Sequence, residues 1–319
     1  MLYLKRIESF FPIFLILALL SGFFIPNFFM YVEQHIHIHF FLMGIMTLLF
    51  LKIDLVDILT HIKKPLLIFY ITFIHLLVLP FFAYWLFQFL DPSLRISIVL
   101  LAALPAGVSS AVFTDIMKGR TSLSLLIVII TNLLSIVTIP LIFYLISKIG
   151  NVADLAGITK SSIDYLAMLN KLCIVIFIPL LIAKIIKKVI LRRYIDKLNL
   201  PDYYNVAILV LLYFMISIAI AFQADVIKYS WQAIFMDIAY LFMSFIVFQF
   251  VGYFSLIWLR KGDKIAAANS TMIMNNVLGI VLALVFFGDN PKIVMYIALS
   301  FIPWNCMIIF KHWYIKYLP

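Results

Sequence analysis

Long apolar stretches follow one another along most of this chain, and each is long enough to cross a lipid bilayer as a helix. A helix that crosses the hydrocarbon core needs about 20 apolar residues. Ten stretches of that kind lie near residues 7–26, 37–56, 66–90, 94–117, 121–147, 164–188, 205–223, 231–259, 264–287 and 292–315. Because a backbone in lipid must satisfy its own polar groups, these stretches predict an all-α polytopic membrane protein with ten transmembrane helices.

The composition supports this class and argues against two others. Apolar residues make up 66% of the chain, whereas soluble domains contain about 45–50%. The net charge of +10 would suggest a nucleic-acid partner in a soluble protein, but here the basic residues lie in short runs between apolar stretches, where they set topology. An enzyme needs a nucleophile beside a base, or a metal cluster, and the histidine-dense run "HIHIHF" (35–40) could at most bind a metal weakly. We expect neither a nucleic-acid binder nor an enzyme.

The lysines and arginines give the chain an orientation, because they favour cytoplasmic loops. When the N-terminus is placed inside, all but six of the 24 basic residues fall on the cytoplasmic side. The six on the other side are Arg95, Lys148, Lys160, Lys171, Lys228 and Lys292. We therefore expect both termini to be cytoplasmic, in an integral protein of the bacterial inner membrane.

The helices are expected to form one transmembrane transporter domain over residues 1–319, since no linker or low-complexity tract divides the chain. The fourth stretch (94–117) and the ninth (264–287) lie in corresponding places, and each is interrupted by polar or helix-breaking residues. With five helices in each half, a repeat must be inverted across the membrane. This predicts one repeat over about residues 1–150 and a second over about 160–319. Paired interrupted helices in inverted halves are typical of the binding site of a secondary transporter.

The interruptions carry "PAGVSS" (105–110) and "MNNVLG" (274–279). Irregular backbone at membrane depth persists only where protein or a water-filled cavity satisfies its N–H and C=O groups. The N-termini of the half-helices would then face bound anions, and freed carbonyls would hold cations. A proline kink, capped by Ser109 and Ser110, is the other interpretation of the first interruption. The candidate substrate-binding residues are Gly107, Val108, Ser109, Asn275 and Asn276.

The two interrupted stretches resemble the bile acid:sodium symporters and their bacterial organic-anion relatives. The resemblance covers nearly the whole chain, and its most specific parts are "LAALPAGVSSAVFTDIMKGRTSLSLLIVIITNLLSIVTIP" (101–140) and "ANSTMIMNNVLGIVLALVFFG" (268–288). It implies two inverted repeats of five helices, with the fourth and ninth helices crossing beside the substrate. It also implies that the first, second, sixth and seventh helices form a panel, and that the other six form a core that moves against it. The implied activity is secondary active transport of a small organic anion by alternating access.

The resemblance also implies where a coupling ion would bind. It places sodium ligands at Ser110, in the first interruption, and at Ser124, near the start of the fifth helix, and hydroxyl oxygens suit a hard cation. The carboxylate that it implies in the ninth helix is absent, because that position falls on Thr271 or, in a second register, on Met272. A glutamine that it implies in the third helix aligns with His75. The ion-coupling candidates are His75, Ser110, Ser124 and Thr271.

Several of these residues have two interpretations. His75 is either a packed, hydrogen-bonded core residue or a titratable replacement for a sodium ligand, which would make protons the coupling ion. Asn275 and Asn276 bind substrate and cation, or they tie neighbouring helices together. Thr131 and Asn132 in the fifth helix are expected to pack against neighbouring helices.

The function therefore has a main expectation and open alternatives. We expect a carrier of a small organic anion, coupled to sodium, to protons or to neither. A transporter-like membrane sensor, which binds the ligand without moving it, is the other alternative. Asp237, in the eighth stretch, is either a functional acid within the membrane or a residue near the outer headgroups. Apart from a sodium ion we expect no cofactor, and apart from the lipid bilayer we expect no obligate partner.

Overall fold

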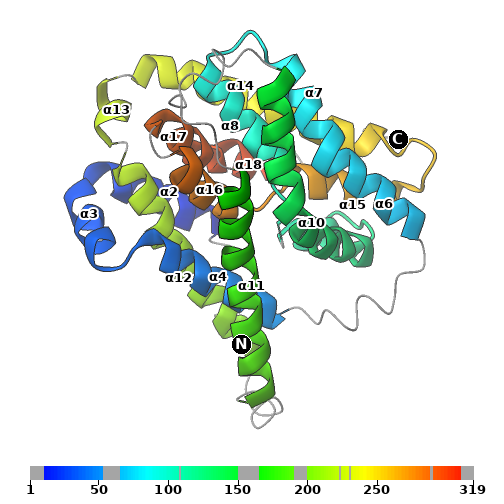
Figure 1. Cartoon of the computed structure of the whole chain (residues 1–319), viewed down its shortest axis with the longest axis horizontal. Helices are drawn as coiled ribbons and strands as arrows, with labels where there is room; N and C mark the ends of the chain where they lie inside the picture. The colour runs from blue at the N-terminus through cyan, green and yellow to red at the C-terminus, as the bar shows by residue number, and fades with distance from the viewer. Residues whose placement is uncertain are drawn as a thin grey trace. The chain divides into compact units, whose positions relative to one another are not determined.

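A computed structural model describes residues 11–52, 65–107, 109–149, 165–189, 200–222, 224–229, 231–287 and 290–309. These residues form helices joined by short connections, and none of them belongs to a β-strand (Figure 1). The prediction of an all-helical protein is confirmed. Each of the ten apolar stretches contains at least one helix, and the fourth and ninth are both interrupted, as expected.

Three helices of the described chain are long and apolar enough to cross a membrane, judged by length and composition alone. They are Leu66–Leu86, Thr121–Ile149 and Ile234–Phe254. A fourth candidate consists of Ile16–Phe24 and Pro26–His35, which are bent by 95° relative to one another. Shorter apolar helices span Pro92–Ala103, Val206–Ala221 and Lys292–Trp304. The ten-span topology therefore stays a prediction.

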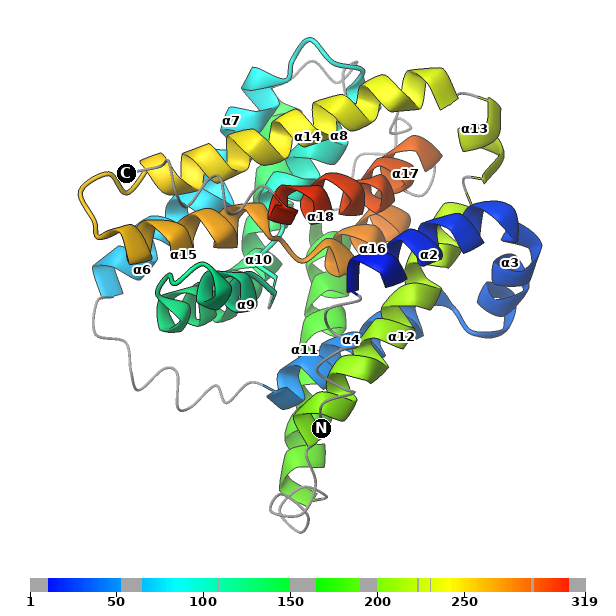
Figure 2. The same cartoon turned by 180° about the vertical axis from the view of Figure 1, so that it is seen from behind.

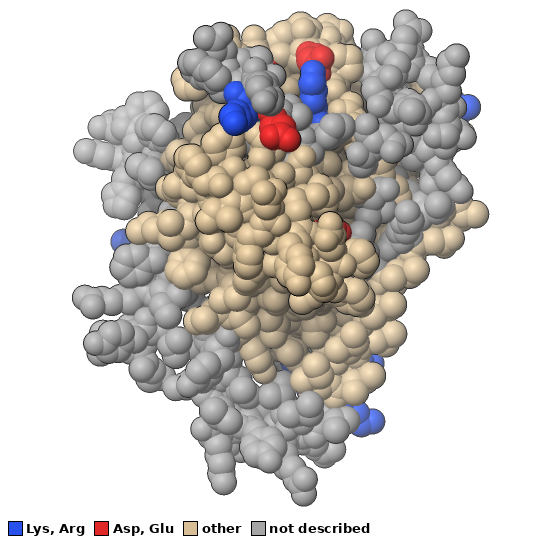
Figure 3. All heavy atoms as spheres, turned by 90° about the vertical axis from the view of Figure 1, so that its left-hand side faces the viewer, with Lys and Arg blue, Asp and Glu red and all other residues tan. Residues whose placement is uncertain are grey.

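The surface of these helices suits a lipid environment. On the helix Leu66–Leu86, the side chains of Leu66, Phe69 and Trp85 are 83%, 70% and 66% exposed. Figure 3 shows one face of the molecule, where the described residues are mostly uncharged and the few lysines, arginines, aspartates and glutamates lie mainly near the top of the view and at its edges. Exposed apolar surface of this extent marks an interaction surface, and in a chain with membrane-spanning helices that surface faces lipid.

The chain divides into two compact units, of which unit 1 comprises Met1–Asp54 and Asn170–Ser230. Its helices are α2 (Phe11–Phe24), α3 (Pro26–His35), α4 (Ile38–Lys52), α11 (Tyr165–Val189, from Asn170 onward), α12 (Leu200–Ala221) and α13 (Ala224–Tyr229). α12 packs against α2, α3 and α4. Unit 1 thus holds the first, second, sixth and seventh predicted helices, which are the four expected in the panel.

Small residues let α2 and α12 approach closely. The Ser21 and Ser217 hydroxyl oxygens lie 3.2 Å apart, and the Tyr213 hydroxyl donates to Ser21 over 2.8 Å. A Cβ on Gly22 would collide with the backbone of Ser217. Close contact between small residues, with hydroxyl hydrogen bonds, is how membrane helices associate without a hydrophobic driving force.

Unit 2 comprises Leu55–Leu169 and Trp231–Pro319 and contains the remaining helices. They are α6 (Pro65–Phe73), the π-helix η1 (Ile74–Val78), α7 (Leu79–Leu86), α8 (Pro92–Ala103), α9 (Ser109–Ile116), α10 (Thr121–Ile149), α14 (Trp231–Phe254), α15 (Lys261–Met272), α16 (Asn276–Phe287), α17 (Pro291–Leu299) and α18 (Phe301–Ile309). α15 packs against α9, α10 and α14, and α8 packs against α7 and α17 (Figure 2). The third, fourth, fifth, eighth, ninth and tenth predicted helices are therefore grouped in one unit.

Candidate functional site

The fourth predicted helix is interrupted between α8 and α9 because of Pro105. A proline disfavours the helical conformation of the residue before it, and Leu104 is extended, with φ −64° and ψ 145°. Pro105 itself has no N–H to continue the ladder. The chain resumes a helix at Ser109, which is the first residue of α9. Val108, one of the candidate substrate residues, lies outside the described part of the chain.

The ninth predicted helix is interrupted between α15 and α16 without any proline. α15 ends at Met272, and Ile273 leaves the helical region with φ −93° and ψ 81°. The Asn275 side chain then accepts a hydrogen bond from the Leu278 N–H at 3.2 Å. A side-chain oxygen that caps the first N–H groups in this way favours the start of a new helix, here α16.

The two interruptions lie against each other and pair as a short antiparallel bridge between Ala106 and Met274. The Gly107 N–H donates to the Ile273 carbonyl and the Asn275 N–H donates to the Pro105 carbonyl, both over 2.8 Å. The crossing of the fourth and ninth helices is thus made by backbone hydrogen bonds between the two broken segments. Each segment thus satisfies backbone groups of the other that have no partner within a helix.

Side chains from neighbouring helices satisfy the remaining backbone groups of the first interruption. The Ala106 N–H donates to the Thr131 hydroxyl at 3.1 Å, and the Asn132 amide donates to the Ala106 carbonyl at 3.0 Å. His75 Nε2 lies 3.1 Å from the Leu104 carbonyl oxygen, which makes this nitrogen the donor. Together with the bridge, these contacts give the carbonyls of Leu104, Pro105 and Ala106 one donor each. Thr131 and Asn132 were expected only to pack against neighbouring helices. Two adjacent polar residues in an apolar stretch were the signal in the sequence for their bonds to the broken backbone.

Four of the five predicted substrate residues lie at the crossing. Gly107 and Asn275 are the two residues whose N–H groups close the bridge, Ser109 opens α9 and Asn276 opens α16. Both half-helices therefore begin within three residues of the bridge. The N-terminal end of each carries roughly half a positive charge, so their position favours a bound anion.

Asn276 also has a role in packing. Its amide donates to the Ser300 hydroxyl over 2.9 Å, in the segment between α17 and α18. Its buried carbonyl oxygen, Oδ1, has no hydrogen-bond partner among the described residues. A buried acceptor without a donor costs about 1–3 kcal/mol, so a ligand or a water that donates to this oxygen would be stabilised. The packing interpretation is therefore observed for Asn276, and its role in substrate binding stays a prediction.

Two of the ion-coupling candidates lie together, in a chain of buried hydroxyls. The Ser110 and Ser124 oxygens are 3.2 Å apart, and the Ser124 and Ser270 oxygens are 3.1 Å apart. All three side chains are fully buried, between α9, α10 and α15. The three hydroxyl groups hydrogen-bond to one another, and all three of their oxygens are neutral.

The Thr271 side chain points away from these serines and does not hydrogen-bond to them. Its hydroxyl donates to the carbonyls of Phe248, Ala267 and Ala268 over 3.0–3.2 Å, so it faces α14 and its own preceding turn. Ser270 takes the place beside Ser124 instead. Consecutive residues of a helix point in directions about 100° apart, so one residue of register decides which side chain meets the serines, and the sequence does not fix that register.

A second polar group that the sequence analysis missed lies beside the serines. The Asn269 amide, next to Ser270 on α15, donates to the Thr114 hydroxyl at 3.2 Å. Thr114 in turn donates to the Ser110 carbonyl at 2.7 Å. Asn269 Oδ1 is buried and has no partner among the described residues. The interface of α9, α10 and α15 is therefore polar, although these helices come from apolar stretches.

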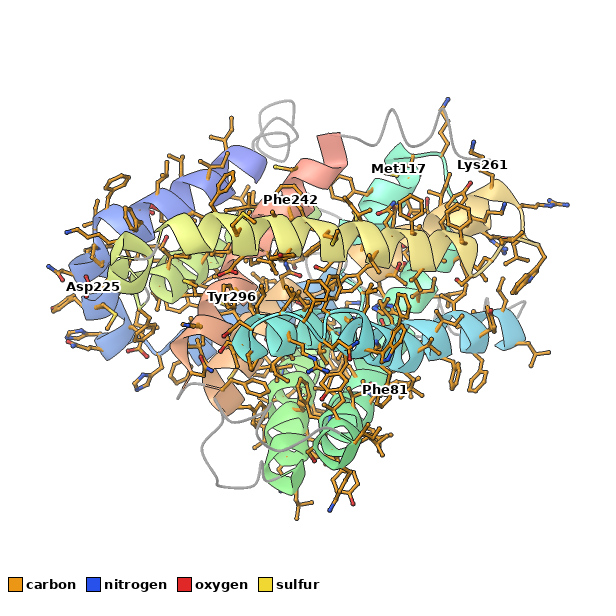
Figure 4. All side chains as sticks on the ribbon, turned by 90° about the horizontal axis from the view of Figure 1, so that it is seen from above. Phe81, Met117, Asp225, Phe242, Lys261 and Tyr296 are labelled. Carbon is orange, nitrogen blue, oxygen red and sulfur yellow. The ribbon has the colours of Figure 1, made fainter. Side chains whose placement is uncertain are left out.

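Polar contacts also tie the ends of unit 2. At one end Arg120 bonds Asp263 over 3.2 Å, and its N–H donates to the Gly262 carbonyl. Asp237, whose location was open, accepts a hydrogen bond of 2.7 Å from the Tyr296 hydroxyl. Figure 4 shows Lys261, the neighbour of Gly262, near one end of this unit and Tyr296 toward the other.

A comparison with protein-family models finds that residues 39–230 match the model described as the Sodium Bile acid symporter family. The matched range is more than half of the 319-residue chain. It runs from the second residue of α4 through α13 and includes the first interruption. A comparison with curated proteins finds no significant match.

Proposed function

The chain belongs to the sodium bile acid symporter family, and on this premise we propose that it carries a small organic anion across the membrane by alternating access. The family is one of transporters of bile acids and organic anions, which also argues against an enzyme. The observation that carries the proposal is the crossing, where α9 and α16 begin, at Ser109 and Asn276, within three residues of the bridge. An anion at this place gains from both helix ends.

An inverted repeat explains why both halves have a broken helix. Ala106 and Met274 are equivalent positions if the two halves are repeats. When the residue numbers of α8 are increased by the spacing between these two residues, the result is 260–271, within one residue of α15. The same shift places α9 inside α16. Repeats of inverted topology are related by a two-fold axis in the membrane plane, and the antiparallel direction of the bridge fits such an axis.

Alternating access requires two bodies, and the division of the chain supports this part of the proposal. Unit 1 has its own packing of α12 on α2, α3 and α4, whereas unit 2 contains the complete crossing. In this proposal unit 2 carries the anion and unit 1 is the panel. The exact acid stays open within the class of small organic anions.

Sodium coupling has weak support from the residues that would bind the ion. The Ser110, Ser124 and Ser270 hydroxyls already hydrogen-bond to one another. No carboxylate takes part in these hydrogen bonds. Neutral oxygens attract a cation less strongly than a carboxylate does in a medium of low dielectric constant. We therefore propose transport that depends weakly on sodium or not at all.

Purified protein in liposomes tests both parts of this function. We expect labelled organic acids, offered as a panel, to include at least one that exchanges with the same unlabelled acid inside. We expect the exchange to persist when choline replaces sodium on both sides. Empty liposomes are the control. If no acid exchanges, the proposal of an organic-anion carrier is refuted. If exchange strictly requires sodium, only the proposal of weak or absent sodium dependence is refuted.

The proposed location is the bacterial inner membrane, with both termini in the cytoplasm, and thiol labelling tests the orientation. Single cysteines introduced at Lys63 and Arg193, which lie outside the described residues, should resist impermeant thiol reagents in intact cells and react after the cells are opened. A cysteine at Lys228 of α13, on the predicted outer side, is the matched control and should react in intact cells. Labelling of the first two from outside would contradict the orientation.

A further inference from the structure

A buried histidine lies beside the end of the first broken helix. His75 belongs to η1, a five-residue π-helix between α6 and α7, inside the membrane-spanning helix Leu66–Leu86. Its side chain is fully buried. The π-helix occurs mostly as single turns inside α-helices, frequently at functional sites, and an ionisable residue inside a membrane helix is by default a candidate for function.

The hydrogen bond of His75 fixes which of its nitrogens is basic. The Leu104 carbonyl can only accept, so Nε2, at 3.1 Å, carries a hydrogen. In a neutral imidazole the other nitrogen then has a free lone pair. This nitrogen, Nδ1, is buried and has no partner among the described residues. The structure therefore presents a buried base whose hydrogen bond to Leu104 is kept in both protonation states.

Burial disfavours a charge on the ring, but the end of the broken helix beside it favours a positive one. Leu104 is the residue that ends α8, and the carbonyl end of a helix carries roughly half a negative charge. A cation bound at a broken helix would interact with carbonyls of this kind. Here a side-chain nitrogen of the protein itself contacts the carbonyl, so a proton on the ring supplies the positive charge that a bound metal ion would otherwise supply.

The helices around His75 supply no acidic side chain that would balance a positive charge on its ring, so that charge would be balanced by an anion at the crossing. The helices packed against η1 are α6, α7, α8 and α10, and none of them contains an aspartate or glutamate. Their titratable or charged side chains are Tyr70, Tyr84, Arg95, Tyr144 and Lys148. Arg95 is nine residues before Leu104 on α8, or about 13 Å along the helix axis, and it lies over the Tyr84 ring. Lys148, near the end of α10, lies over the Tyr144 ring.

We propose that His75 binds the coupling proton, so that this carrier moves its organic anion together with a proton. The inference rests on the proposed transport function and specifies the coupling ion. Leu104, the partner of His75, is three residues from Gly107 at the crossing. A proton on Nδ1 makes the ring positive and favours the anion at the crossing, and by linkage the bound anion favours the proton. One proton binds at Nδ1 on the side of higher proton concentration and leaves on the other, so a monoanion and its proton cross without net charge.

A pH gradient across sodium-free proteoliposomes tests this coupling. With the outside more acidic, the parent should accumulate the acid that it exchanges, by about tenfold per pH unit, since one pH unit on a single proton is worth 1.36 kcal/mol. Entry of the acid should make a weakly buffered medium more alkaline, by one proton per monoanion. This second measurement requires no variant. A parent that reaches the same level with and without the gradient would overturn the proposal.

Two variants separate coupling from folding. His75→Gln keeps an amide donor for the Leu104 carbonyl but cannot hold the proton, so it should lose gradient-driven accumulation while exchange stays measurable. His35→Gln, at an exposed site on α3, should accumulate like the parent. Full accumulation by His75→Gln would refute the assignment of the proton to His75. If the parent exchanges no acid at all, the transport proposal itself fails and this inference fails with it.

Discussion

Replacing Gly107 by alanine is expected to reduce exchange of the transported acid by about tenfold or more. A Cβ at this position would lie 2.9 Å from the Met274 carbonyl oxygen, 3.2 Å from its carbon and 3.3 Å from the Ile273 carbonyl oxygen. All three atoms are backbone, so no side-chain rotation relieves the contact and the two broken segments must move apart. Overpacking of this kind costs about 1–3 kcal/mol, and about 1.4 kcal/mol corresponds to a factor of ten.

A second glycine-to-alanine change provides the control for Gly107→Ala. A Cβ on Gly262, at the start of α15, would lie 3.7 Å or more from its nearest neighbours, which is an ordinary contact. Gly262→Ala also keeps the carbonyl that accepts from the Arg120 N–H. This variant should exchange the acid at the rate of the parent. If Gly107→Ala also does so in the same liposomes, the bridge is not needed for transport.

The sequence was sufficient to predict the helices and the first interruption. Runs of about 20 apolar residues predict helices whatever their neighbours, and Pro105 ends a helix for a local reason. The bend after the first predicted helix did not follow from the apolar pattern. Residues 7–26 were expected to form one helix, whereas α2 ends at Phe24 and α3 continues from Pro26 to His35 at a sharp bend. Proline is found in the first turn of a helix as well as after the end of one. Pro26 therefore does not show whether the helix simply ends there or whether a second helix begins in a new direction.

The details of the candidate site depend on contacts between distant segments. No proline interrupts the ninth predicted helix, and its broken segment is held by hydrogen bonds to Pro105 and Gly107, more than 160 residues away. The choice of Ser270 over Thr271 beside Ser124 depends on how α15 is rotated against α10. Such rotations follow from packing, which a single sequence does not report. The predicted substrate residues were found at the crossing because helix breakers and amides mark that site directly.

Replacing Thr131 by valine is expected to destabilise unit 2, because the Ala106 N–H then loses its acceptor at 3.1 Å. Valine has nearly the same shape as threonine, so the change removes a hydrogen bond and leaves the packing in place. A buried N–H without a partner costs about 1–3 kcal/mol. Thermal unfolding in detergent should show a lower Tm, by about 2–4 °C for each kcal/mol. Exchange of the acid should slow as well, since Ala106 belongs to the bridge.

Thr138→Val is the matched control, because it makes the same change seven residues further along α10. The Thr138 hydroxyl is buried and has no hydrogen-bond partner among the described residues. Removing it relieves the cost of burying an unpaired polar group, so the Tm should stay the same or rise. Opposite effects of one substitution on one helix would show that Thr131 stabilises the broken backbone and does not merely pack. Equal changes in Tm for both variants would contradict this account, and the irregular backbone at the crossing would then need another source of stability.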